Sequence, residues 1–156
     1  MNAIAGIAVA LKEATTESFK EYAHQTVKNA KKLADILQSV YGFRIVSDGT
    51  DSHLMVVDVA SKHIDGKTAA VALEKAGIEC SASTVPYDIN PPMKPSGIRL
   101  GLSILTTRGM KEDDMSVVAA YINKSLDNYN DDRVLSTIKD SVSKFIKQFN
   151  KWDNYD

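Results

Sequence analysis

The segment PSGIRLG, at residues 95–101, holds the side chain best suited to binding chemistry. Arg99 stands between two apolar residues, so a strand here would turn its guanidinium to the face opposite its neighbours. A guanidinium is a planar set of donors that matches a carboxylate or a phosphate in bidentate fashion. Gly97 and Gly101 on either side are typical of close approach by a backbone or a ligand. The segment therefore predicts an anion-binding arginine; the alternative is a half-exposed arginine on the water-facing side of a strand.

The histidines and the cysteine do not form a recognisable catalytic or metal-binding motif. His24, His53 and His63 are far apart in sequence, and none has a second ligand at the close spacing of metal sites. Cys80 has no paired base or nucleophile elbow nearby, and at a strand end it is expected to be a small core residue. Neither GxGxxG nor a P-loop occurs. We therefore expect no metal site and no catalytic residue in this chain, which leaves Arg99 as the candidate.

The spacing of apolar residues predicts helices and short strands that alternate along the chain. Thr15 or Thr16 can cap the second helix, Gly42 can end it, and Asp65 can open the third. The segment 81–95 contains all four prolines and is predicted to be an ordered, irregular loop. This order predicts an α/β fold in which helices cover a small sheet. The predicted helices are 3–11, 16–41, 65–76, 115–126 and 134–149, and the predicted strands are 43–47, 53–59, 78–80 and 95–101.

Composition excludes several classes of function. The chain has 156 residues, 44% of them hydrophobic, which is enough for a real core. Its formal net charge of -1 gives no electrostatic reason to bind nucleic acid or an anionic membrane. The single cysteine excludes an internal disulfide and favours a reduced, cytoplasmic setting. No apolar run approaches the roughly 20 residues that span a bilayer, and the apolar start is predicted to be a helix, not a signal peptide.

The order of the segments resembles the carboxyl-terminal part of serine hydroxymethyltransferase, over nearly the whole chain. The most specific piece is SGIRLG followed shortly by TTRG, and the next is the turn SDGTDSH with HLMVVD. The segments that carry the resemblance are, in order, AIAGIAVALKEA, FKEYAHQTVKNAKKLADIL, GFRIVSDGTDSHLMVVDV, DGKTAAVALEKAGIEC, TVPYD and PSGIRLGLSILTTRG.

This resemblance implies a fold-type-I pyridoxal phosphate enzyme that works as a homodimer. The family interconverts serine and glycine and moves a one-carbon unit to tetrahydrofolate, with pyridoxal phosphate as electron sink. The arginine of the family's SGIRLG motif, here Arg99, binds the carboxylate of the amino-acid substrate. The loop before it resembles the family's folate-contacting loop, which implies four residues beside the pterin: Ser83, Pro91, Pro92 and Met93.

The resemblance also implies how the chain is divided. Residues 1–15 would form a helix that packs on a missing large domain, and residues 16–156 would form the carboxyl-terminal small domain. The amino-terminal catalytic part of the enzyme would be the partner.

The chain departs from the family's pattern at several positions. Ser81 and Ser83 stand where asparagines are usual, and Pro91-Pro92-Met93 replaces serine-proline-phenylalanine. Leu102-Ser103 replaces a threonine-proline pair, and Asn2 stands where a histidine is common. A serine cannot reproduce the paired donor and acceptor of an asparagine amide. The departures therefore bear on folate contact more than on carboxylate contact.

The family's Schiff-base lysine lies in a threonine-rich, histidine-lysine stretch, and no such stretch occurs in this sequence. The residues that hold the pyridine nitrogen and the phosphate, and the glutamate used in acid-base work, are also absent. The chain alone is expected to be inactive and not to bind pyridoxal phosphate. Two readings stay open: part of a working enzyme (an excised domain, a gene fragment or half of a split protein), or a free-standing, non-catalytic binding or interaction module.

Overall fold

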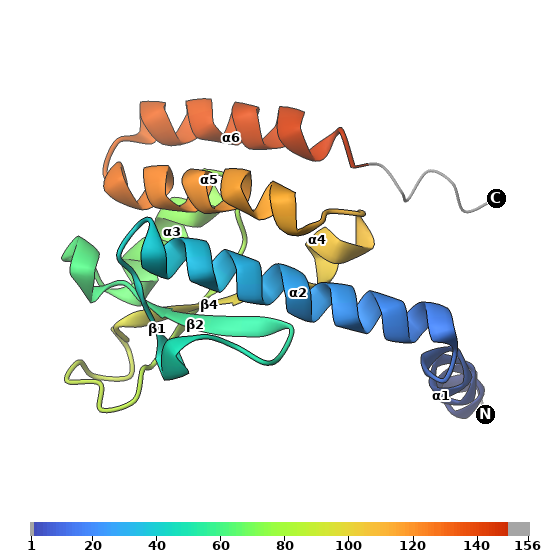
Figure 1. Cartoon of the computed structure of the whole chain (residues 1–156). Helices are drawn as coiled ribbons and strands as arrows, with labels where there is room; N and C mark the ends of the chain where they lie inside the picture. Colours follow the sequence, from blue (N-terminus) through green and yellow to red (C-terminus); the bar gives the residue numbers. More distant parts are fainter. Residues whose placement is uncertain (1, 150–156) are drawn as a thin grey trace.

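The structure is a computed structural model that describes residues 2–149, so the last seven residues of the predicted domain 16–156 lie outside the described residues. The chain is mostly helical, and three single 3-10 turns join its elements (Figure 1). The helices are α1 (Asn2–Ala14), α2 (Glu17–Ser39), α3 (Gly66–Lys75), α4 (Ser103–Thr107), α5 (Met115–Asp127) and α6 (Asp132–Ile146), and the 3-10 turns are Val46–Asp48, Ala60–Lys62 and Glu112–Asp114.

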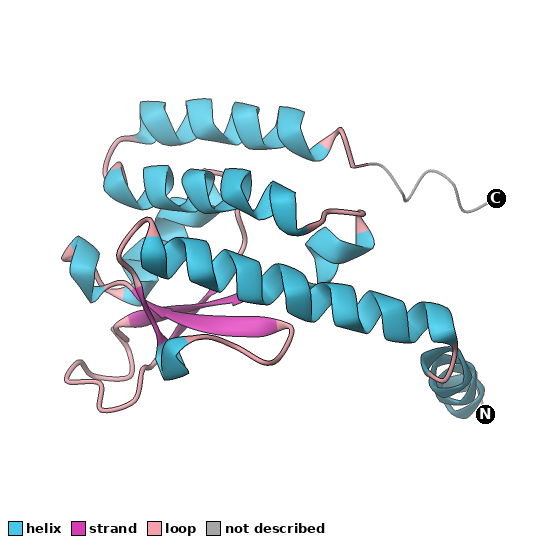
Figure 2. Cartoon of the chain, viewed as in Figure 1, coloured by secondary structure: helices cyan, strands magenta, loops and turns pink. Residues whose placement is uncertain are grey.

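The described residues form one four-stranded sheet in which every neighbouring pair is antiparallel (Figure 2). Its order is β1-β2-β4-β3, so β2 and β4 are central. The strands are β1 (Arg44–Ile45), β2 (Leu54–Asp58), β3 (Ser81–Ser83) and β4 (Gly97–Gly101). The register places Arg99 opposite Val56 on one side and opposite Ser81 on the other.

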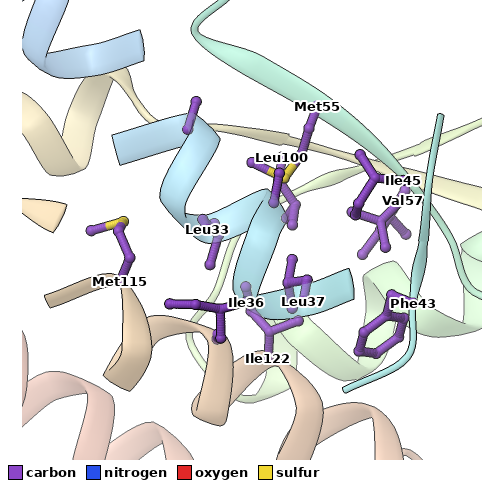
Figure 3. Close-up of a cluster of buried hydrophobic side chains, with 14 of the residues drawn as sticks. Leu33, Ile36, Leu37, Phe43, Ile45, Met55, Val57, Leu100, Met115 and Ile122 are labelled. Atoms are coloured by element: carbon purple, nitrogen blue, oxygen red, sulfur yellow. The ribbon is translucent and has the colours of Figure 1, made fainter. Parts of the chain in front are cut away.

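One face of the sheet is covered by helices, which confirms the predicted α/β fold. Helix α2 packs on β1 and β2, α3 packs on β3 and β4, and α5 packs on both of these helices. Alternate strand residues point to this side, where they are buried with α2 and α5 side chains in a close-packed core (Figure 3). Full burial of one such side chain contributes about 1.5–3 kcal/mol. The core strand residues are Ile45, Met55, Val57, Ile98 and Leu100.

The predicted caps and stops position the helices. The Thr16 hydroxyl accepts a hydrogen bond from the Phe19 amide at the start of α2. The Asp65 carboxylate accepts one from the Thr68 amide at the start of α3, at 2.8 Å. Gly42 has a φ of 70°, the left-handed conformation that ends a helix with little strain in glycine.

Several predicted boundaries were wrong. The strand expected at 78–80 is displaced to Ser81–Ser83, because the chain leaves α3 through a tight turn in which the Ile78 amide donates to the Leu73 carbonyl. The irregular loop is therefore shorter than predicted and covers 84–96. The first strand is cut to two residues because the chain turns at Ser47, whose φ is 64°. Helix α4 was not predicted, since a helix this short carries no readable periodicity.

Helix α1 packs mainly against α2 and lies apart from the sheet and the other described helices (Figure 1). None of its residues is buried, although its sequence is largely apolar. Its larger side chains, between 58% and 69% exposed, are Ile4, Ile7, Val9 and Leu11. No described helix is both long enough and apolar enough to cross a membrane.

Candidate functional site

The sheet face opposite the helices carries the predicted binding residue. Along β4, residues 97, 99 and 101 point to this face, and Ile98 and Leu100 point to the core. Arg99 is exposed at the centre of the face, between half-buried Val56 on β2 and exposed Ser81 on β3. Side chains directly opposite one another in such a ladder are about 4.5–5.5 Å apart at Cβ. The alternation that buries the core thus presents the guanidinium to solvent.

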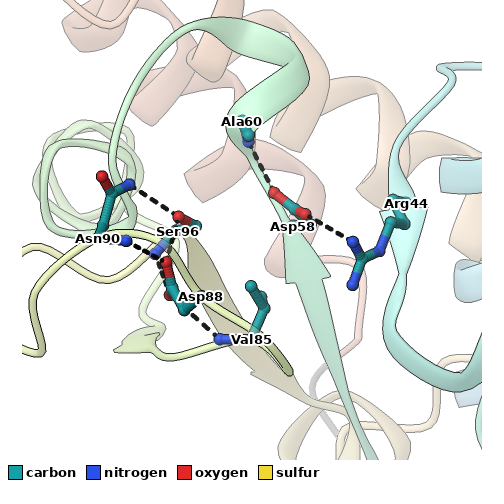
Figure 4. A network of polar contacts seen from close by, with 7 residues as sticks. All are labelled: Arg44, Asp58, Ala60, Val85, Asp88, Asn90 and Ser96. Atoms are coloured by element: carbon teal, nitrogen blue, oxygen red, sulfur yellow. Dashed lines mark hydrogen bonds and ion pairs between the residues drawn. The ribbon is translucent and has the colours of Figure 1, made fainter.

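The two arginines of this face differ in their charge environment. Arg44 Nη1 lies 3.5 Å from Asp58 Oδ2, and the other oxygen of Asp58 accepts a hydrogen bond from the Ala60 amide (Figure 4). Arg99 makes no hydrogen bond and no ion pair with any side chain within residues 2–149. Its five donors therefore remain available to an anion from solvent.

The two glycines beside Arg99 have different roles: one is closely approached by the protein itself, and the other faces open space. A Cβ at Gly97 would lie 2.8 Å from Val85 Cγ1 and 3.0 Å from the Ser83 carbonyl oxygen, so this position is filled by the protein itself. A Cβ at Gly101 would meet nothing within 4 Å. Open space next to Arg99 is therefore on the Gly101 side.

The loop 84–96 connects β3 to β4 and is held at its base by Asp88 (Figure 4). The Asp88 carboxylate accepts hydrogen bonds from the amides of Val85 (3.3 Å), Asn90 (3.0 Å) and Ser96 (2.9 Å), and from the Ser96 hydroxyl (2.7 Å). The Asn90 side-chain amide also donates to the Ser96 hydroxyl, at 2.8 Å. One carboxylate thus joins the two ends of the loop.

These hydrogen bonds hold the pKa of Asp88 well below its usual range, at about 2, with the Ser96 amide as the largest cause. Sequence reasoning missed Asp88. The signal was present, because Asp in a proline-rich stretch commonly accepts from the backbone amide two residues later.

The predicted folate-contacting residues fall in two places. Ser83 is half-buried and points to the same sheet face as Arg99, two residues along β3 from Ser81. The other three, Pro91, Pro92 and Met93, are exposed in the loop, away from the strand ladder, and Met93 is 78% exposed. The structure therefore brings Ser83 and Arg99 to one face, whereas the loop residues lie in the segment that Asp88 closes.

Other candidate sites are poorly supported. No group of three histidine, cysteine or acidic side chains able to hold a metal occurs in the described part of the chain. Burial raises the pKa of the Cys80 thiol to about 11, and Cys80 packs against the core as predicted. A hollow of about 340 Å³ between α4, α5 and α6 is lined largely by apolar side chains and includes none of the predicted site residues.

Comparison with known proteins confirms the family resemblance. Residues 1–122 match the family model described as serine hydroxymethyltransferase. The chain is similar to proteins named serine hydroxymethyltransferase from Acidobacterium capsulatum (47% identical, 94% of this chain, 34% of the relative), Myxococcus xanthus (46%, 96% and 35%) and Methanosarcina barkeri (46%, 96% and 36%). It spans about a third of the length of these curated relatives. The chain belongs to the serine hydroxymethyltransferase family.

Proposed function

We propose that this chain is the carboxyl-terminal domain of a serine hydroxymethyltransferase, the enzyme that interconverts serine and glycine with one-carbon transfer to tetrahydrofolate. The observation that carries the proposal is the environment of Arg99. Its guanidinium is exposed on the face of the sheet that no described helix covers, and no described side chain neutralises its charge.

In this proposal Arg99 binds the carboxylate of serine or glycine. A bidentate pair fixes both the position and the plane of a carboxylate, so it orients the amino acid as well as holding it. The rigid β4 backbone carries the arginine, and the space beside Gly101 admits the rest of the substrate. Ser81, directly across the ladder from Arg99, supplies a hydroxyl next to the bound carboxylate.

The loop 84–96 and the adjoining β3 would contact the folate co-substrate. Pro91, Pro92 and Met93 give an apolar exposed surface that suits a flat pterin ring, and the hydroxyl of Ser83 faces the same side as Arg99. The hydroxyl of Ser83 donates only a long bond of 3.4 Å to the Thr84 carbonyl, so it retains the capacity to bind a ligand.

The described residues do not fit a pyridoxal phosphate site. A Schiff-base lysine is desolvated or next to another cation, so that its amine loses its proton. The described lysines are exposed except Lys62, which is half-buried and lies 2.6 Å from the Asp127 carboxylate, a partner that favours the charged amine. We therefore assign the cofactor and its lysine to the amino-terminal part of the enzyme, where the cofactor would serve as electron sink.

The partner of this chain would be that amino-terminal part, and the complete enzyme would be a homodimer. Helix α1 supports this assignment, since its apolar side chains are exposed and it stands apart from the domain core. An exposed apolar surface of this kind marks an interaction site. In this proposal α1 packs on the large domain.

The alternative function is a free-standing, non-catalytic module. It is favoured by Ser81 and Ser83, because the site face carries short hydroxyls where the family has amides.

An experiment that separates the two functions mixes this chain with the part of the Myxococcus xanthus enzyme that precedes the matched segment. We expect a stable complex on size-exclusion chromatography and conversion of serine to glycine that requires tetrahydrofolate. A chain that forms no complex and restores no activity would support the non-catalytic module.

A further inference from the structure

Asp88 makes more hydrogen bonds than any other described side chain of the sheet face or its loop. Oδ1 accepts from the Asn90 amide and the Ser96 hydroxyl, and Oδ2 accepts from the Val85 and Ser96 amides. Ser96 is buried and immediately precedes β4, while Val85 lies two residues after β3. The carboxylate therefore fixes the two ends of the loop to each other.

A second contact, made by Val85, fixes the β3 end of the loop to the sheet. The Val85 side chain is buried against Gly97, where its Cγ1 occupies the space that a Cβ would need. Val85, Pro95 and Ser96 are the buried residues of the loop, Asp88 is half-buried, and the other loop residues are exposed. Its large apolar side chains are Tyr87, Ile89 and Met93, with exposures of 100%, 96% and 78%.

The exposed part is nevertheless held in a defined shape. Tyr87 has a φ of 59°, a left-handed conformation that is uncommon for a residue with a side chain and persists only where neighbouring contacts impose it. Asp88, the next residue, provides those contacts. A loop that is ordered before binding avoids the entropy cost of ordering on binding, so its ligand is bound more tightly.

We propose that Asp88 is the positioning residue of the loop 84–96. It holds the exposed part of the loop in the conformation that binds the ligand, and so sets the affinity of the loop for that ligand. This proposal rests on the proposed function for the ligand of the loop, a reduced folate, and on the observed hydrogen bonds for the way Asp88 holds the loop.

The test compares Asp88→Asn with the wild-type chain. An asparagine has one acceptor oxygen and one NH2 group, so in either orientation two of the four donors would face another donor. We expect amide hydrogen exchange at Ser96 to become at least ten-fold faster. Asp35→Asn on α2 is the matched control, since it removes an exposed carboxylate far from the loop in sequence and should leave Ser96 unchanged. Unchanged exchange at Ser96 in Asp88→Asn would overturn the proposal.

Ser96→Ala is a second variant that keeps the carboxylate and removes only the hydroxyl. Because the Ser96 amide still donates to Asp88, exchange there should rise by a smaller factor, about two- to five-fold. This variant decides the proposal if Asp88→Asn does not fold: no change in exchange at the amide of residue 96, after allowance for the intrinsic rates of serine and alanine, would then overturn it.

The binding measurement uses 5-formyltetrahydrofolate, with loop amide resonances of the 156-residue chain as the readout. We expect the affinity to fall at least ten-fold in Asp88→Asn and to be unchanged in Asp35→Asn. Faster exchange with unchanged affinity would overturn the positioning role. If the wild-type chain does not bind the probe, the folate assignment of the proposed function fails, while exchange at Ser96 still decides whether Asp88 fixes the loop.

Discussion

Among single residues, Arg99 is proposed to bind a carboxylate because no described acidic side chain lies beside its guanidinium. Because its guanidinium is exposed and contacts no described acid, Arg99→Lys should change the free energy of unfolding by less than ~0.5 kcal/mol. An arginine in a buried internal ion pair would instead lose about 3–5 kcal/mol. Thermal denaturation distinguishes these cases. Arg133→Lys, at an exposed arginine of α6, is the control, and a much larger loss at Arg99 would refute the binding role.

The acid stability of the loop depends on Asp88. Its pKa falls from 3.8 to about 2 on folding, so the stabilisation is fully present above the unfolded value. It is lost as the pH falls from about 4 to 2. We therefore expect wild type to exceed Asp88→Asn in melting temperature at pH 6, and the two to converge near pH 2. A gap that stays constant over this range would show that the Asp88 charge does not hold the loop.

The two residues show what a sequence can and cannot reveal. The exposure of Arg99 could be predicted, since one charged residue in an alternating apolar run must point away from the core. The local bond from the Asn90 amide to Asp88 has a sequence signal, but the bonds from Ser96 have none, because Ser96 lies eight residues after Asp88 and reaches it only through the way the loop closes. The different roles of Gly97 and Gly101 likewise depend on where Val85 packs.

At the level of elements, the packing of the loop on strand β4 can be tested by placing alanine at each of two glycines of this strand. Gly97→Ala would force a Cβ against Val85 and the Ser83 carbonyl, so we expect a loss of ~1–3 kcal/mol in the free energy of unfolding. Gly101→Ala adds a methyl group to open space and should be neutral or slightly stabilising. Urea denaturation measures both. Equal effects at the two positions would mean that the loop does not pack on β4 as described.

Helix α1 should drive self-association of the chain when no large domain is present. Its apolar side chains are exposed, and burying them against a second copy removes that surface from water. We expect the wild-type chain to form dimers or larger species at high concentration. Ile7→Lys should shift it toward monomer, whereas Ser39→Lys at the far end of α2 should not. Analytical ultracentrifugation that shows a clean monomer for wild type would contradict this expectation.

The elements themselves could be predicted to different degrees. Helices α2, α3 and α5 follow from long apolar periodicity and from the caps Thr16 and Asp65. The short strands were less accessible. The position of β3 is set by its pairing with β4, in which Ser81 lies opposite Arg99. The local sequence of β3 does not predict this pairing.

The molecule as a whole has two surfaces without a covering element in the described chain: the sheet face with Arg99 and the helix α1. The chain also spans about a third of its curated relatives. These facts fit together if the rest of the enzyme covers α1 and completes the site at Arg99.

The most direct test of this account measures turnover in the complex with the amino-terminal part of the Myxococcus xanthus enzyme. Wild-type chain and Arg99→Lys chain are compared at equal complex concentration, and folding is checked by thermal denaturation. A lysine keeps the charge but loses the bidentate geometry, so we expect serine-to-glycine turnover to fall at least 100-fold while the melting temperature is unchanged. Equal turnover in the two complexes would contradict the assignment of Arg99 as the carboxylate-binding residue.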